Sequence, residues 1–209
     1  MGQLLPCRGH ENRIQICRDY TIFPVVHAKL LKGQSIPSCA GGTIVDHYYR
    51  FHAVLKADSS KEYTIFCGYE AAADFCSILG VETPPLFDPL KNVGLPGTGT
   101  GGASSASSPT AWNPAMLQLV NAINILLCFW PKRADSVLES VLREVSPYPT
   151  KRPYTRFVKS VNTMLRNAKT TMRAVLTRME AENGPVKDYR FDELIKILEK
   201  ESIPQYFEP

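Results

Sequence analysis

Residues 43–57 read TIVDHYYRFHAVLKA, and this stretch decides the fold of the N-terminal half. Successive side chains of a β-strand point to opposite faces of the sheet. The odd positions here are mostly apolar: Val45, His47, Tyr49, Phe51, Ala53 and Leu55. The even positions are mostly polar and include Asp46, Tyr48, Arg50 and His52. This alternation predicts one strand with an apolar face and a polar face.

The segments on either side of this strand predict a small α+β module. Residues 58–61 (DSSK) are typical of a turn, and residues 63–67 of a returning strand, so the two strands form a hairpin. A helix is expected from Glu70 to Leu79, with Gly80 as its C-terminal stop. Upstream, residues 13–28 are rich in β-branched and aromatic side chains, and Pro24 interrupts them. We expect an edge strand or two short strands there.

A Gly/Ser-rich segment, residues 96–110 (PGTGTGGASSASSPT), separates this module from the second half. Such a segment buries no apolar surface and is typical of a flexible linker. We therefore expect an N-terminal α+β domain at 1–92, a linker at 93–112 and a helical domain at 113–209. The predicted fold class is α+β, with a hairpin-and-helix module followed by a helical bundle.

Four helices are predicted in the second half, at about 114–130, 134–145, 153–182 and 191–201. Asn113 and Pro114 are typical of an N-cap followed by the first helical residue. The third helix is the longest, and its apolar residues alternate between spacings of three and four, as in a coiled coil or bundle. These residues are Val158, Val161, Leu165, Ala168, Met172, Val175 and Met179.

Four residues of the N-terminal half have the arrangement of a zinc site. Cys7 and His10 have knuckle spacing, Cys39 precedes the hairpin, and Cys67 lies where a strand gives way to a helix. A knuckle, a hairpin and a ligand at a helix start resemble the treble-clef zinc modules. That resemblance implies a structural zinc held by Cys7, His10, Cys39 and Cys67. The alternative is that the thiols are reduced and pack as small hydrophobic side chains.

The polar face of the 43–57 strand is the candidate for catalysis. Asp46, Arg50 and His52 share that face, which would suit a nuclease or a transferase. A sheet with one solvated face has the same pattern, however. The common local signatures of zinc hydrolases, P-loop enzymes, serine hydrolases and zinc deaminases are missing from the sequence.

The basic third helix is the sharpest functional feature of the sequence. Residues 154–179 contain no Asp or Glu. On one continuous helix, Lys159, Arg166, Lys169 and Arg173 would fall within an arc of about 80°, away from the apolar seam. Like charges so placed favour an acidic partner, either nucleic acid or an acidic protein surface. Acidic residues of the neighbouring helices offer the alternative of internal pairing: Asp135, Glu139, Glu144, Asp192, Glu193, Glu199 and Glu201.

Charge and composition narrow the function classes. Residues 1–92 hold nine basic and nine acidic residues, so the net charge of +4 belongs to the remainder. No membrane span or secretory signal is apparent, and we expect a cytoplasmic protein. The leading hypothesis is a non-catalytic binding or adaptor protein that docks an acidic partner through the basic helix. The alternatives are the strand-face enzyme and a structural subunit of a larger assembly.

Overall fold

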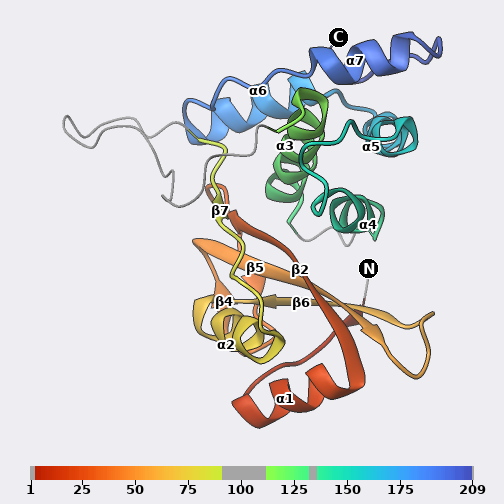
Figure 1. Cartoon of the computed structure of the whole chain (residues 1–209). Coiled ribbons are helices and arrows are strands. Elements are labelled where there is room, and N and C mark those ends of the chain that lie inside the picture. Colours follow the sequence, from red (N-terminus) through yellow and green to blue (C-terminus); the bar gives the residue numbers. More distant parts are fainter. Residues whose placement is uncertain (1–2, 91–111, 132–135, 209) are drawn as a thin grey trace. The chain divides into compact units, whose positions relative to one another are not determined.

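The computed structural model describes residues 3–90, 112–131 and 136–208 (Figure 1). The class is mixed α+β, as predicted. The strands are β1 (Gln3–Leu4), β2 (Tyr20–Lys29), β3 (Ile36–Pro37), β4 (Thr43–Ile44), β5 (His47–Leu55), β6 (Glu62–Cys67) and β7 (Leu86–Phe87). The helices are α1 (His10–Asp19), α2 (Tyr69–Leu79), α3 (Pro114–Phe129), α4 (Ser136–Val145), α5 (Thr155–Asn167), α6 (Met172–Asn183) and α7 (Asp192–Glu199).

The chain divides into two compact units. The sheet unit comprises residues 1–89 and 122–144, and the helical unit comprises residues 90–121 and 145–209. Helix α3 therefore contributes its first half to the helical unit and its second half to the sheet unit. The predicted linker lies largely outside the described residues, so the predicted division at 93–112 stays a prediction. Within the described part of the chain, no helix is both long and apolar enough to cross a membrane.

The sheet unit is built on a five-stranded mixed sheet in the order β1-β6-β5-β2-β7. The predicted hairpin is confirmed: β5 and β6 pair antiparallel, with Phe51 opposite Ile65. The predicted strand is shorter than expected, because residues 43–44 form β4, which pairs with β3 in a separate small sheet. The two residues between β4 and β5 belong to neither strand.

The edge strand or two short strands predicted within residues 13–28 are one strand, β2, and the first part of that stretch is helical instead. His10–Asp19 form α1, which follows Gly9 at a φ of 86°. The periodicity of a short apolar run does not distinguish a helix from a strand. In α1 the buried residue is Ile16, which packs into the core of the sheet unit. Pro24 lies where the register of β2 against β5 shifts. The parallel partner β7 reaches only His27 and Ala28, so β2 is an edge strand around Pro24.

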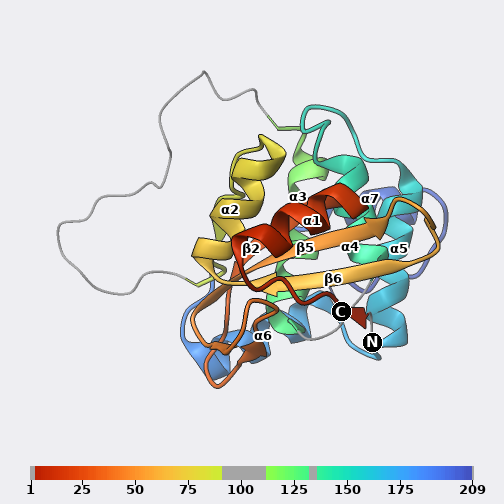
Figure 2. The ribbon, with the colours of Figure 1, turned by 90° about the horizontal axis from the view of Figure 1, so that it is seen from below.

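Both faces of β5 are covered by helices (Figures 1 and 2). The odd face, with Tyr49, Phe51 and Ala53, packs into one core with Phe75 of α2 and Ile16 of α1. The even face lies against the second half of α3 and against α4. There the Tyr48 hydroxyl donates to the Leu127 carbonyl at 3.0 Å. A sheet covered on both faces has no solvated side, so the expected polar face is buried.

The helical unit has the predicted apolar seam but not the predicted long helix. The seam residues are buried except for Ala168, which is half-buried. The predicted long helix is interrupted between α5 and α6, where Lys169 has a φ of 52°. Thr171 then caps α6, and its hydroxyl accepts from the Ala174 amide at 3.1 Å. A threonine N-cap supplies one of the acceptors that a new helix start needs, so two shorter helices replace one.

Helix ends elsewhere follow the sequence signals. The Asn113 side chain accepts from the amides of Ala115 and Met116 at 3.1 and 3.3 Å, which is the predicted N-cap of α3. Gly80 ends α2 in the left-handed region with a φ of 67°. A side chain there would be strained, and glycine is the residue that adopts this conformation without a penalty.

Candidate anion-binding pocket

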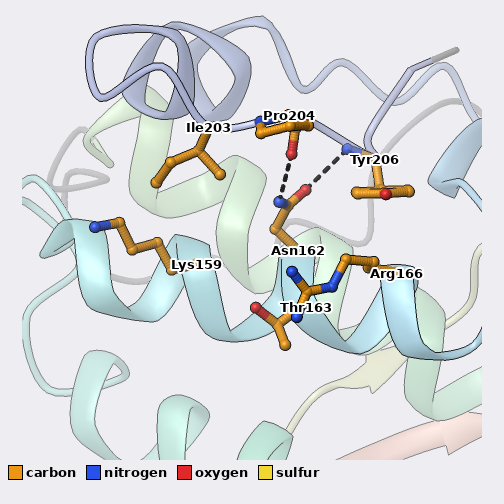
Figure 3. A pocket seen from close by; sticks show the side chains of 7 residues that line it. All are labelled: Lys159, Asn162, Thr163, Arg166, Ile203, Pro204 and Tyr206. Atoms are coloured by element: carbon orange, nitrogen blue, oxygen red, sulfur yellow. Dashed lines mark hydrogen bonds between the residues drawn. The ribbon is translucent and has the colours of Figure 1, made fainter.

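A pocket of about 370 Å³ opens on the helical unit along α5 (Figure 3). One wall is α5 itself, and the other is the segment that follows α7. Two cationic side chains, two hydroxyl groups and one amide reach its lining. The lining residues are Lys159, Asn162, Thr163, Arg166, Ile203, Pro204 and Tyr206.

The second wall is fixed by one buried amide. Asn162 donates to the Pro204 carbonyl at 2.9 Å and accepts from the Tyr206 amide at 2.8 Å, as the dashed lines in Figure 3 show. The Tyr206 carbonyl in turn accepts from the Met172 amide at the start of α6. The next residue, Phe207, is fully buried, and its ring lies 5.8 Å from that of Phe191. The second wall is therefore held by the hydrogen bonds of the Asn162 side chain and by the packing of Phe207 against Phe191.

The two cations of the pocket differ in how they are held. Lys159 forms an ion pair with Glu201, and both side chains are about two-fifths exposed. A hydrogen bond from Lys159 and its positive charge lower the pKa of Glu201 below its ordinary value, and so does a hydrogen bond from Thr155. Arg166 is exposed, and its side chain lies beside Thr163 in Figure 3. Among the described acidic residues, none forms an ion pair with Arg166.

The other two predicted basic residues do not join this pocket. Lys169 lies in the turn between α5 and α6, where its backbone is left-handed. Arg173 lies on α6 and approaches Glu208 at 3.6 Å. The predicted arc of Lys159, Arg166, Lys169 and Arg173 assumed one continuous helix, and the break at 168–171 removes it. Of the four, only Lys159 and Arg166 line the pocket.

A different stripe of α5 replaces that arc. At about 100° per residue, Arg156, Lys159, Thr163 and Arg166 fall within about 80° of one another. Three of these four side chains are cationic. Guanidinium, ammonium and hydroxyl groups are all donors for phosphate or carboxylate oxygens. These side chains make the pocket a candidate site for an anion.

The candidate catalytic residues of β5 are not assembled into a site. Arg50 is fully buried and forms an ion pair with Glu139 of α4. His52 is also buried, and its Nδ1 lies 3.0 Å from the other oxygen of Glu139. Asp46 lies at the far end, outside the strand, and pairs with Lys29 at 3.0 Å. The buried triad of Arg50, His52 and Glu139 fastens α4 to the sheet.

A histidine pair that the sequence did not reveal lies at the other end of β5. His27 Nε2 and His47 Nδ1 are 2.8 Å apart, and His27 Nδ1 lies 3.2 Å from the Pro84 carbonyl. Because that carbonyl only accepts, His27 Nδ1 carries the proton, and a neutral His27 accepts from His47. The His27 ring also stacks on Tyr49 at 3.8 Å between centroids. No local signal could find this pair, since it depends on the register of β2 against β5.

Acid should destabilise the sheet unit through His27. Burial and the nearby His47 lower the pKa of His27, while the Pro84 carbonyl opposes this. Below the ordinary histidine pKa of 6.5, the unfolded chain therefore binds more protons at this position than the folded protein. The free energy of unfolding should fall as the pH drops below that value. In His27→Gln, urea titrations between pH 7 and pH 5 should show a smaller fall than in the unsubstituted protein. An equal fall in both proteins would contradict this assignment.

Three of the four predicted zinc ligands, the cysteines, lie in or against one core, whereas His10 does not. Cys7 and Cys67 are fully buried in the core that the sheet forms with α1 and α2, and Cys39 packs against that core. Burial and the neighbouring Cys39 raise the pKa of Cys7 to about 12. His10 points elsewhere, and its Nδ1 lies 2.8 Å from Asp74 of α2.

Within the described ranges, no group of three or more His, Cys, Asp or Glu side chains has the geometry of a metal site. Zinc binding by Cys7, His10, Cys39 and Cys67 stays a prediction. The described cysteines are all free thiols.

The chain belongs to the protein family described as "Uncharacterised conserved protein UCP028583", whose family model matches residues 6–209. That match extends over both compact units, so the pocket residues and the buried triad both lie inside it. No curated protein and no solved structure matches the chain.

Proposed function

We propose that this protein is a non-catalytic binding protein that docks an anionic group of an acidic partner in the pocket on α5. The observation that carries the proposal is that Lys159, Thr163 and Arg166 line one cavity. Lysine supplies a point charge, and arginine supplies a planar fork of donors that matches two oxygens of a phosphate or a carboxylate.

The internal ion pair of Lys159 does not compete strongly with such a partner. Lys159 and Glu201 are both substantially exposed, and ion pairs of that kind contribute little to stability because water screens them. A ligand that engages Lys159 and Arg166 together gains two charge-assisted contacts, each stronger than a surface pair. Glu201 therefore holds Lys159 in place until an anion replaces it.

The charge of the surrounding sequence favours a polyanion over a single small anion. Residues 145–179 contain eight Lys and Arg and no Asp or Glu. A field of one sign raises the rate at which an oppositely charged partner meets the surface. Nucleic acid and an acidic protein surface both meet this description. The enzyme hypothesis has less support, because Arg50 and His52 are buried against Glu139 and Asp46 pairs elsewhere.

A pair of double variants tests the pocket. In Lys159→Gln with Arg166→Gln, glutamine keeps the helix propensity, and α5 should fold normally. Binding is measured by fluorescence anisotropy with two labelled probes, an oligothymidylate and a poly-glutamate peptide. For whichever probe the unsubstituted protein binds, the double variant should bind at least tenfold more weakly.

The matched control removes two other exposed cations of the helical unit. Arg178→Gln with Arg190→Gln changes the net charge by the same amount, but neither residue lines the pocket. This control should retain most of the affinity. Equal losses in the two double variants would show that overall charge, and not the pocket, sets the affinity. Absence of binding to both probes would contradict the proposal.

A further inference from the structure

We infer that the acidic partner is a single-stranded nucleic acid, whose bases stack on exposed tyrosine rings at the start of α5. The inference rests on the proposed function and names the partner of the same surface. Its basis is a set of aromatic side chains that the fold leaves in solvent beside the basic stripe, each with a cation at its ring.

Tyr154 and Tyr148 carry this surface. Tyr154 is 71% exposed and Tyr148 is 51% exposed, although both are large aromatic side chains. The Lys151 ammonium lies 4.8 Å from the centre of the Tyr148 ring, and the Arg156 guanidinium lies 5.5 Å from that of Tyr154. Both rings thus combine a face for stacking with a positive charge for a neighbouring phosphate.

The loop that presents these rings is held by backbone hydrogen bonds. The Tyr148 amide donates to the Val145 carbonyl at 2.9 Å, and the Lys151 amide donates to the Tyr148 carbonyl at 3.1 Å. The Asn113 amide donates to the Pro149 carbonyl at 2.9 Å. Trp112 directly precedes Asn113 in the sequence and is itself 41% exposed. The stacking rings therefore sit on an ordered support.

Tyr154 and the pocket lie along the same helix, and Arg156 adjoins the Tyr154 ring. Tyr154 is the residue immediately before α5, and the stripe of Arg156, Lys159, Thr163 and Arg166 starts two residues later. At 1.5 Å per residue, the distance along the helix from Tyr154 to Arg166 is about 18 Å. A strand of nucleic acid that places a base on Tyr154 can then place phosphates on the cations that follow along α5.

This combination favours a single strand over the other polyanions. The faces of the bases are stacked on each other inside a duplex, and they become available to side chains only when the strand is unpaired. An acidic peptide would use the cations, but it offers no ring faces to Tyr148 and Tyr154. Exposed tyrosines beside cations thus offer base stacking, which an acidic peptide without aromatic side chains does not gain.

The test uses the full chain and a labelled oligothymidylate of about ten nucleotides, a length within the usual range of single-strand sites. Tyr154→Ala and Tyr148→Ala should each weaken binding by about tenfold, the typical effect of losing one stacked base. Tyr154→Phe keeps the ring and should bind like the unsubstituted protein. Tyr69 is 64% exposed on the sheet unit, so Tyr69→Ala is the matched control and should have no effect.

The outcomes separate this inference from the proposed function. If the poly-glutamate peptide binds through Lys159 and Arg166 and the oligothymidylate does not, the inference is overturned and the proposed function stands. If the oligothymidylate binds but the two alanine variants bind it as tightly as Tyr69→Ala does, stacking is excluded. Tighter binding of a duplex of the same length than of the single strand would also overturn the inference.

Discussion

Replacing Glu139 with alanine should lower the free energy of unfolding of the sheet unit by about 3–5 kcal/mol. The substitution leaves the guanidinium of Arg50 fully buried without its carboxylate partner and also removes the partner of His52 Nδ1. A buried charge that loses its counter-charge is one of the most destabilising changes a single substitution makes. Urea denaturation followed by circular dichroism measures the effect.

Glu144 provides the matched control, because it is an exposed glutamate on the same helix. Glu144→Ala should change the stability by less than about 1 kcal/mol. A second variant isolates the charge: Arg50→Met with Glu139→Met removes both charges and should recover most of the loss. If Glu139→Ala were as mild as the control, the ion pair with Arg50 would not hold α4 to the sheet.

Phe207→Ala should lower the free energy of unfolding of the helical unit by about 3–5 kcal/mol. The side chain is fully buried against Phe191, and its removal leaves a cavity that the surrounding residues fill only in part. Because Phe207 anchors the segment that contains Pro204 and Tyr206, the same change should open one wall of the pocket. Anion binding should then weaken even under conditions where the protein stays folded.

Phe207→Leu retains most of the apolar volume and should have a much smaller effect on stability and binding. Comparing the two variants separates the loss of packing from the loss of the aromatic ring. If Phe207→Ala bound the polyanion with unchanged affinity, the segment after α7 would not be a functional wall of the pocket.

Local structure was the part of the fold that the sequence could predict. The β5–β6 hairpin, the end of α2 at Gly80 and the cap at Asn113 each follow from signals within a few residues. The burial of Arg50 and His52 could not be predicted, because it depends on helices that lie some 70 to 90 residues further along the chain. An alternation of polar and apolar residues looks the same whether water or a buried glutamate faces the polar side.

The sequence has a local signal for the break between α5 and α6, but the spacing of its apolar residues favours one continuous helix. Thr170 and Thr171 are β-branched, and threonine is a good N-cap, but the apolar seam continues across the break without a change of spacing. Burial alone therefore favoured one long helix. Lys159 and Arg166 line the same pocket because both lie within α5, and their role in binding stays a prediction. Tyr206 and Pro204 were missed, since the Asn162 side chain that holds them is an isolated polar residue in the sequence.

The salt dependence of oligothymidylate binding tests the central claim, that Lys159 and Arg166 receive the phosphates of a partner, most directly. The logarithm of the affinity falls linearly with the logarithm of the salt concentration, by about 0.7 per phosphate contact on a single strand. The slope of Lys159→Gln with Arg166→Gln should therefore be shallower than that of the unsubstituted protein by about 1.4. Arg178→Gln with Arg190→Gln should keep the full slope. An unchanged slope in the pocket variant, with binding intact, would place the phosphates elsewhere and contradict the account.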